Sequence, residues 1–300
     1  MPRFAANLSL MYGEHPFADR FAAAAADGFA GVECQFPYAW PATELARRRA
    51  DAGVEMVLIN MPAGDAAAGE RGLGCLPGRQ DAFRRAFADQ ALPYAQALGC
   101  PRIHVMAGVA PPGIDRGALR DVFLGNLQWA AALAASAGVQ LLVEPLNPRD
   151  VPGYLLHRQA DAHQLVAQVG AANVAVQMDL YHCQIVEGDV SCKLSHYLDA
   201  TQRPVRVGHL QMASVPARHE PDEGELAYRH LFDLIDSLGW PGWIGAEYRP
   251  RAGTREGLGW FAPYRTHLRP PGALTDRRPR EVLALTAREA LAKGQEKGSP

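Results

Sequence analysis

The stretch Gly138-Val-Gln-Leu-Leu-Val-Glu-Pro-Leu-Asn147 directly follows a long helix-like segment, Arg116–Ala137. Glycine tolerates the left-handed conformation that commonly ends a helix, so Gly138 marks a helix end. The apolar run behind it has the length and composition of a buried strand. That strand finishes on an acidic residue, Glu144. This order of helix, glycine, apolar strand and polar residue recurs along the chain and indicates its fold.

Strands and helices alternate throughout the first 264 residues. Eight runs are predicted as strands: Phe4–Leu10, Gly31–Phe36, Val54–Asn60, Arg102–Ala107, Val139–Glu144, Val174–Asp179, Arg206–Met212 and Trp243–Tyr248. Helices are predicted at Pro16–Asp27, Pro41–Ala52, Arg79–Leu98, Arg116–Ala137, Arg158–Val169, Ile185–Ala200, Glu225–Leu238 and Arg255–Tyr264. Such alternation implies right-handed crossovers and a parallel sheet, and eight units favour a closed (β/α)8 TIM barrel. No glycine-rich turn follows the first strand, which argues against a dinucleotide-binding fold.

The length and composition fit one large domain. The chain has 300 residues, of which 48% are hydrophobic, and α/β barrels of roughly 250 residues are common. We expect the barrel domain to span residues 1–266. Residues 267–300 would form a C-terminal extension that is partly helical or mobile. The glycine-rich segment Met61–Gly78 is long for a strand–helix loop, and such loops often cover or bind ligands.

Charge and cysteine usage exclude several classes of partner. The net charge is −2, and no basic run coincides with an aromatic cluster, so we expect neither nucleic acid nor a membrane surface as a partner. The most apolar stretch, Trp129–Val143, is too interrupted for a membrane span of about 20 residues. No signal peptide is visible, and the five cysteines form no CxxC pair. Reduced thiols in a cytoplasmic protein are therefore expected, with homo-oligomerisation left open.

Polar residues end the last four predicted strands at equivalent positions. These residues are Glu144, Asp179, Gln211 and Glu247. In a TIM barrel the carboxyl ends of the strands carry the chemistry. Buried carboxylates without partners are costly, so three of them converging need a cation. Ligation by oxygen alone suits a hard ion, and we expect one divalent ion, Mg²⁺ or Mn²⁺. For each residue alone, a helix cap or a loop arginine partner is an equal alternative.

Several stretches in this order and spacing resemble the hydroxypyruvate isomerase family, which belongs to the xylose isomerase-like TIM barrels. They are Met61-Pro-Ala-Gly-Asp65, Gly69-Glu-Arg-Gly72, Glu144-Pro-Leu-Asn147, Asp179-Leu-Tyr-His182, Gly208-His-Leu-Gln211, Arg218-His-Glu-Pro221, Glu247-Tyr-Arg-Pro250 and Gly257-Leu-Gly-Trp260. The resemblance covers roughly residues 3–264. Arg249 departs from it, since a lysine is frequent there, and the C-terminal tail has no counterpart.

The resemblance implies an activity and roles for the strand-end residues. Glu144, Asp179, Gln211 and Glu247 would hold the metal ion. Glu144 and Glu247 would also transfer a proton through an enediolate, interconverting hydroxypyruvate and 2-hydroxy-3-oxopropanoate (tartronate semialdehyde). The partner would then be a small hydroxy-keto acid or sugar.

Other polar residues near strand ends are candidates for substrate binding, with Arg218 expected to bind the carboxylate. The set comprises Tyr12, Asn60, His182, His209, Arg218 and Glu220. Three alternatives to the activity stay open. The same metal site could serve an isomerase or epimerase of another small sugar or sugar acid, such as 2-oxo-tetronate or a ketose. A DNA-repair nuclease of the wider barrel superfamily and a non-catalytic sugar-binding protein are the others.

Overall fold

The computed structural model describes residues 1–199 and 205–265. Eight parallel strands close into a barrel in chain order, with β1 pairing with both β2 and β8. The strands are β1 Arg3–Asn7, β2 Gly31–Cys34, β3 Glu55–Asn60, β4 Arg102–His104, β5 Gln140–Val143, β6 Val174–Asp179, β7 Val207–Met212 and β8 Trp243–Ala246. The predicted TIM barrel is thus confirmed. The expected extension at 267–300 lies outside the described residues.

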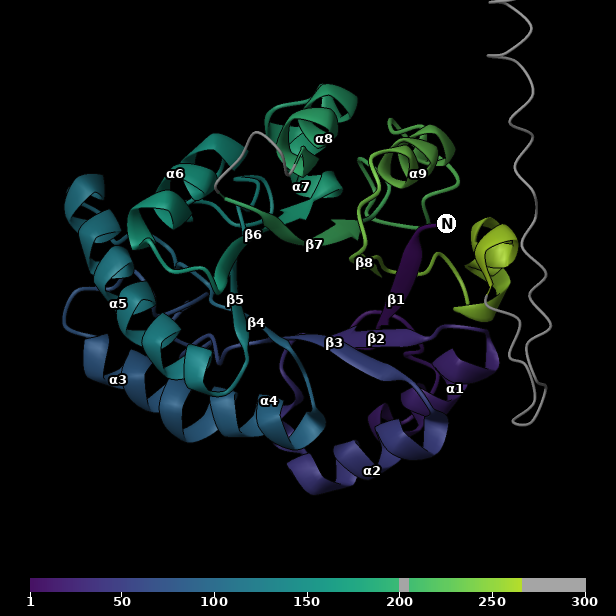
Figure 1. Ribbon diagram of the computed structural model, residues 1–300, viewed down its shortest axis with the longest axis horizontal. Helices are drawn as coiled ribbons and strands as arrows, with labels where there is room; N and C mark the ends of the chain where they lie inside the picture. The colour runs from purple at the N-terminus through teal and green to yellow at the C-terminus, as the bar shows by residue number, and fades with distance from the viewer. Residues whose placement is uncertain (200–204, 266–300) are drawn as a thin grey trace, which may run out of the picture. The chain divides into compact units, whose positions relative to one another are not determined.

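Helices surround the strands, as Figure 1 shows. The α-helices are α1 Arg20–Ala26, α2 Ala42–Ala52, α3 Gln80–Arg85, α4 Leu92–Leu98, α5 Arg116–Ser136, α6 Gln159–Val169, α7 Leu180–Val186, α8 Val190–Leu198 and α9 Tyr228–Ser237. Three short 3-10 segments, η1 Phe17–Asp19, η2 Pro37–Ala39 and η4 Arg255–Tyr264, and one π-helical segment, η3 Ala86–Ala91, complete the set. In the described part of the chain, no helix is both long and apolar enough to cross a membrane.

Among the predicted helices that differ from the structure, two are interrupted for a clear physical reason. The helix expected at 185–200 is two helices, α7 and α8, and residue 200 lies outside the described part. Gly188 and Asp189 separate them, because both adopt positive φ values (64° and 50°) that a helix cannot continue through. The helix expected at 79–98 contains the π-helical segment η3. Pro93 follows it and has no N–H to donate to a carbonyl one turn earlier, so a regular α-helical ladder is interrupted there.

Five of the eight strands, β1, β2, β4, β5 and β8, end earlier than predicted. β5 ends at Val143 and β8 at Ala246, so Glu144 and Glu247 lie just after their strands rather than within them. Residues immediately beyond the strands of a barrel line its mouth. The shorter strands therefore leave both carboxylates at the position where the fold places chemistry.

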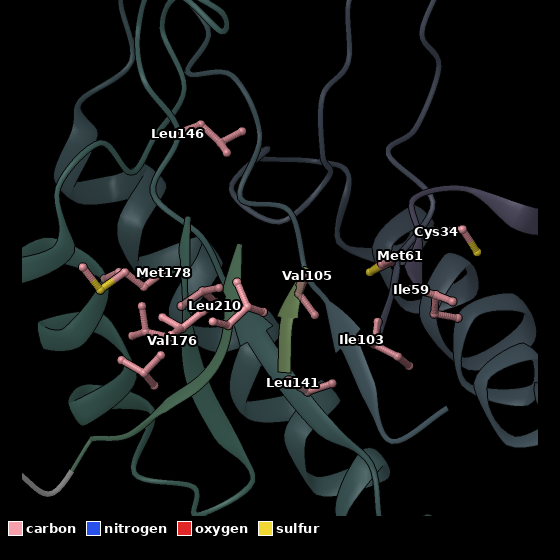
Figure 2. Close-up of a cluster of buried hydrophobic side chains, with 14 of the residues drawn as sticks. Cys34, Ile59, Met61, Ile103, Val105, Leu141, Leu146, Val176, Met178 and Leu210 are labelled. Atoms are coloured by element: carbon pink, nitrogen blue, oxygen red, sulfur yellow. The ribbon is translucent and has the colours of Figure 1, made fainter. Parts of the chain in front are cut away.

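Apolar side chains pack between the strands and the surrounding helices. Figure 2 shows part of this cluster, including Val176 and Met178 from β6 and Leu210 from β7, all fully buried. A second, smaller cluster contains only strand residues, with Trp243 at its edge. A Cβ atom at Gly31 would lie 2.7 Å from the Trp243 ring, so only glycine fits there.

Candidate active site

Buried polar groups, among them His104, Glu144 and Glu247, line a cavity of about 560 Å³. The polar residues on its wall come from the ends of five strands and the loops behind them. They are Gln35, Asn60, His104, Glu144, His182, Arg218 and Glu247, together with Glu70, Arg71 and Gln90. Apolar residues of the segment Met61–Gly78 close one side of the cavity. A small polar ligand would be enclosed there by charged groups and a loop.

Three ionisable side chains converge on one point of this wall. Atoms of Glu144, Asp179 and His182 all lie within 4.8 Å of one another, and all three residues are buried. The β6–β7 register places Asp179 directly beside Gln211. Asp179 also begins α7, because its Oδ1 accepts a hydrogen bond from the Tyr181 N–H at 2.8 Å. That cap turns the other carboxylate oxygen, Oδ2, toward His182 Nε2, 3.6 Å away.

The acids in this cluster raise one another's pKa. Burial, followed by the charges of Glu247 and Asp179, holds the pKa of Glu144 well above its usual range. Burial raises the pKa of Asp179 to about 7, although Arg218 opposes the shift. Burial also raises the pKa of Glu247, again against Arg218. Without a further cation beside Arg218, these three acids therefore tend to keep their protons.

The donor atoms fit a divalent cation. Glu144 Oε1 and Asp179 Oδ2 are both buried without a hydrogen-bond partner among the described residues. Unpartnered buried carboxylate oxygens are costly unless a cation binds them. Gln211 lies beside them, but its Oε1 accepts from Gln177 and its Nε2 donates to Glu33. Ligation by Gln211 would require its amide to exchange these partners.

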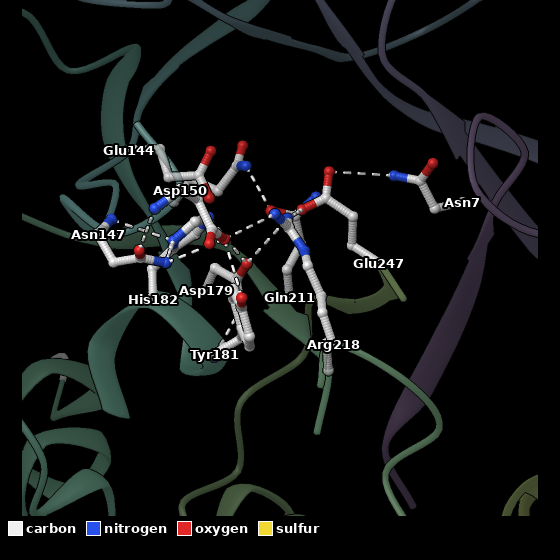
Figure 3. A network of polar contacts seen from close by, with 12 residues as sticks. Asn7, Glu144, Asn147, Asp150, Asp179, Tyr181, His182, Gln211, Arg218 and Glu247 are labelled. Carbon is white, nitrogen blue, oxygen red and sulfur yellow. Dashed lines mark hydrogen bonds and ion pairs between the residues drawn. The ribbon is translucent and has the colours of Figure 1, made fainter. Parts of the chain in front are cut away.

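Arg218 spans the acid cluster, as Figure 3 shows. Its Nη2 lies 2.7 Å from Glu247 Oε2 and 3.9 Å from Asp179 Oδ2, and its Nη1 lies 3.4 Å from Asp150 Oδ2. The guanidinium also stacks over the Tyr181 ring at 4.8 Å. Burial lowers the pKa of Arg218, but the surrounding carboxylates raise it above its ordinary value. Arg218 thus holds the Glu247 carboxylate in place.

A second polar layer lies beneath the cavity and centres on Glu33 of β2. Its Oε1 accepts from Asn7 Nδ2 at 2.9 Å and Gln211 Nε2 at 2.8 Å, and its Oε2 lies 2.7 Å from His209 Nε2. Asn7 also reaches Glu247 at 3.4 Å (Figure 3). This layer therefore supports both Gln211 and Glu247 from below.

Most of the predicted site residues are brought together. Glu144, Glu247, Asn60, His182 and Arg218 lie on the cavity wall, with Asp179 and Gln211 buried beside them. The other three candidates for substrate binding, Tyr12, His209 and Glu220, do not line the cavity.

Each of these three has a different partner. The His209 ring faces Glu33 in the layer below. The Glu220 carboxylate binds the main-chain N–H and the guanidinium of Arg251. Tyr12 is buried and donates its hydroxyl to Asp27 Oδ2 at 3.2 Å.

Two residues of the candidate site were not found from the sequence. Glu33 interrupts the apolar strand Gly31–Cys34, which was a signal of a buried charge. His104 ends β4 on the cavity wall, and its Nδ1 lies 3.4 Å from Glu144 Oε2. Burial lowers the pKa of His104 to about 3. Its ring is therefore neutral at physiological pH.

Comparison with known proteins agrees with the barrel fold. The model of the xylose isomerase-like TIM barrel family matches residues 21–264. A 2-oxo-tetronate isomerase from Cupriavidus necator is 57% identical over 88% of this chain and 99% of its own. A hydroxypyruvate isomerase from Escherichia coli is 41% identical over 88% of this chain and all of its own, 100%.

A solved structure extends the comparison. The crystal structure titled AP endonuclease, family 2, from Brucella melitensis has 49% sequence identity and a TM-score of 0.84, and the match covers 89% of this chain and 100% of that one. The chain belongs to the xylose isomerase-like TIM barrel family, and it is an isomerase.

Proposed function

We propose that the protein isomerises small 2-keto-3-hydroxy acids by moving the carbonyl group from C2 to C3. The observation that carries this proposal is the pair of glutamates on one cavity wall, Glu144 and Glu247, beside a cluster suited to a divalent ion. 2-Oxo-tetronate is our first candidate, because the relative of that name has 57% identity against 41% for the hydroxypyruvate isomerase. Hydroxypyruvate, expected from the sequence, becomes the second candidate. The cavity of about 560 Å³ has room for the extra carbon.

The two glutamates would carry the proton between adjacent carbons. One carboxylate removes the C3 proton, and the C–H electrons shift to form an enediolate across C2 and C3. The other carboxyl group delivers a proton to C2, the proton of the C3 hydroxyl passes to the oxygen on C2, and the carbonyl re-forms at C3. A carboxyl that holds a proton near neutral pH suits the delivering role. Burial raises the pKa of both Glu144 and Glu247, which favours the protonated form that the delivering residue needs.

Four residues would hold Mg²⁺ or Mn²⁺: Glu144, Asp179, Gln211 and Glu247. A bound divalent ion would supply positive charge next to the oxygens on which negative charge develops. The unpartnered oxygens of Glu144 and Asp179 support this assignment. We also place the enzyme in the cytoplasm, where its five cysteines, all free in this structure, would stay reduced.

A substrate panel followed by NMR tests the proposed function. The panel contains 2-oxo-tetronate, hydroxypyruvate and a neutral ketose such as D-psicose, each with Mn²⁺ or Mg²⁺. We expect kcat/KM for the two acids to exceed that for the ketose by at least about tenfold. A preference for the ketose would favour an epimerase instead. Absence of turnover on every substrate would favour a binding protein, and cleavage of abasic DNA would favour a nuclease.

A further inference from the structure

Two arginines lie on the cavity wall, and their surroundings differ. Arg218 contacts the carboxylates of Glu247, Asp179 and Asp150. Arg71 is exposed at the mouth, and its guanidinium donates only to the main-chain oxygen of Glu70, at 2.9 Å. Within residues 1–199 and 205–265, no carboxylate pairs with Arg71. Its positive charge therefore faces the cavity without a counter-charge.

The loop that carries Arg71 is held in a defined conformation. The neighbouring Glu70 side chain is only 10% exposed and pairs with Arg79. Its Oε2 also accepts from the Asp65 N–H at 2.6 Å. The Glu70 carboxylate thus ties two points of the loop together. Because both carboxylate oxygens of Glu70 have these partners, Glu70 does not pair with the Arg71 guanidinium.

Two glycines let this loop pack closely against its surroundings. A Cβ atom at Gly64 would lie 2.2 Å from Glu70 Oε2. Gly72 has a φ of 122°, and a Cβ there would lie 2.6 Å from the Met106 main-chain oxygen, just beyond β4. The residues on both sides of Arg71 are thereby fixed, so the arginine is presented to the cavity from a defined backbone.

We infer that Arg71, rather than Arg218, binds the carboxylate of the substrate. This inference rests on the proposed function and names the group that selects acids over neutral sugars. A substrate carboxylate at Arg218 would be repelled by three carboxylates around one guanidinium. At Arg71 the substrate carboxylate would meet a planar guanidinium that has no carboxylate partner among the described residues and can bind it through two hydrogen bonds. The acid end of the substrate then lies under the loop, with C2 and C3 toward Glu144 and Glu247.

The test compares Arg71→Ala, Arg71→Lys and Arg218→Ala with the wild type, on 2-oxo-tetronate and on a neutral ketose. Arg71→Ala should lower kcat/KM for the acid at least tenfold, mainly through KM, and change the ketose value by less than twofold. Arg71→Lys should recover part of the loss. Arg218→Ala should affect both substrates equally through kcat, because it releases Glu247.

Binding of tartronate, an unreactive small dicarboxylate, gives a readout without turnover. Its dissociation constant by calorimetry should rise at least tenfold in Arg71→Ala and stay unchanged in the control Arg85→Ala, an exposed arginine of α3 outside the cavity wall. The assignment of Arg71 would be overturned if Arg71→Ala lowered kcat/KM equally for the acid and the ketose, or if it left the dissociation constant of tartronate unchanged. A wild type that binds tartronate but isomerises no acid would instead overturn the proposed function.

Discussion

Removing the Glu33 carboxylate should destabilise the barrel and disable the site above it. Glu33 is 1% exposed and accepts hydrogen bonds from Asn7 and Gln211 at 2.9 and 2.8 Å, with His209 Nε2 at 2.7 Å. Each donor left buried without a partner costs about 1–3 kcal/mol. Three such donors predict a loss of about 4 kcal/mol or more for Glu33→Ala. Glu33→Gln keeps one acceptor oxygen and should cost about 2 kcal/mol.

Urea unfolding of the two variants measures these losses, with Glu55→Ala as the control. Glu55 lies on the neighbouring strand with a 63% exposed side chain and an ion pair to Arg3, so its loss should stay within about 0.5 kcal/mol. Because Glu33 supports Gln211 and Asn7, its variants should also lose activity beyond the control. A change below about 1 kcal/mol in Glu33→Ala would refute the reasoning, since it would mean that water replaces the carboxylate without cost.

Two further predictions concern the metal and the thiols. At about one hundred times its dissociation constant, Mn²⁺ should stabilise the EDTA-stripped protein by about 2.7 kcal/mol, a Tm rise of roughly 5–10 °C. Scanning fluorimetry should show the rise in the wild type and in the exposed control Asp19→Asn, but not in Asp179→Asn. Only Cys192 is exposed, whereas burial raises the pKa of Cys75 to about 11 and of Cys100 and Cys183 to about 12. A disulfide reagent at pH 8 should therefore modify only Cys192 quickly, and faster as the pH rises. The remaining thiols should react only after unfolding. A second fast thiol would contradict the burial of the other four cysteines.

The strand ends were predictable because two local signals coincide there. A helix-ending glycine marks the start of several strands, and strand alternation indicates which side chains face inward. Glu144, Asp179, Gln211 and Glu247 each lie within one residue of a strand's carboxyl end. Their positions along the chain place them around one half of the mouth without any long-range information.

Long-range contacts decide the rest of the site. The partners of Glu33 come from β1 and β7, and those of Glu220 from the loop that contains Arg251. Local sequence does not specify such pairings. It also does not specify that three carboxylates surround Arg218 while Glu70 turns to Arg79 and leaves Arg71 unpaired. The sequence therefore predicted Arg218 for the substrate carboxylate, and it gave no signal that Arg71 is the arginine left without a carboxylate partner in the part of the chain that the structure describes.

Deuterium exchange in D2O tests the central claim, that one of Glu144 and Glu247 removes the C3 proton and the other protonates C2. A glutamine amide can neither take up nor release these protons. Glu144→Gln and Glu247→Gln, each with its bound metal quantified, should therefore isomerise 2-oxo-tetronate below a tenth of the wild-type rate. That loss corresponds to a barrier rise above about 1.4 kcal/mol. One variant keeps the base that faces C3. NMR should show that this variant alone exchanges the C3 proton of 2-oxo-tetronate for deuterium without forming the 3-keto isomer. Isomerisation above a tenth of the wild-type rate in either variant, or C3 exchange by both, would contradict the two-glutamate account.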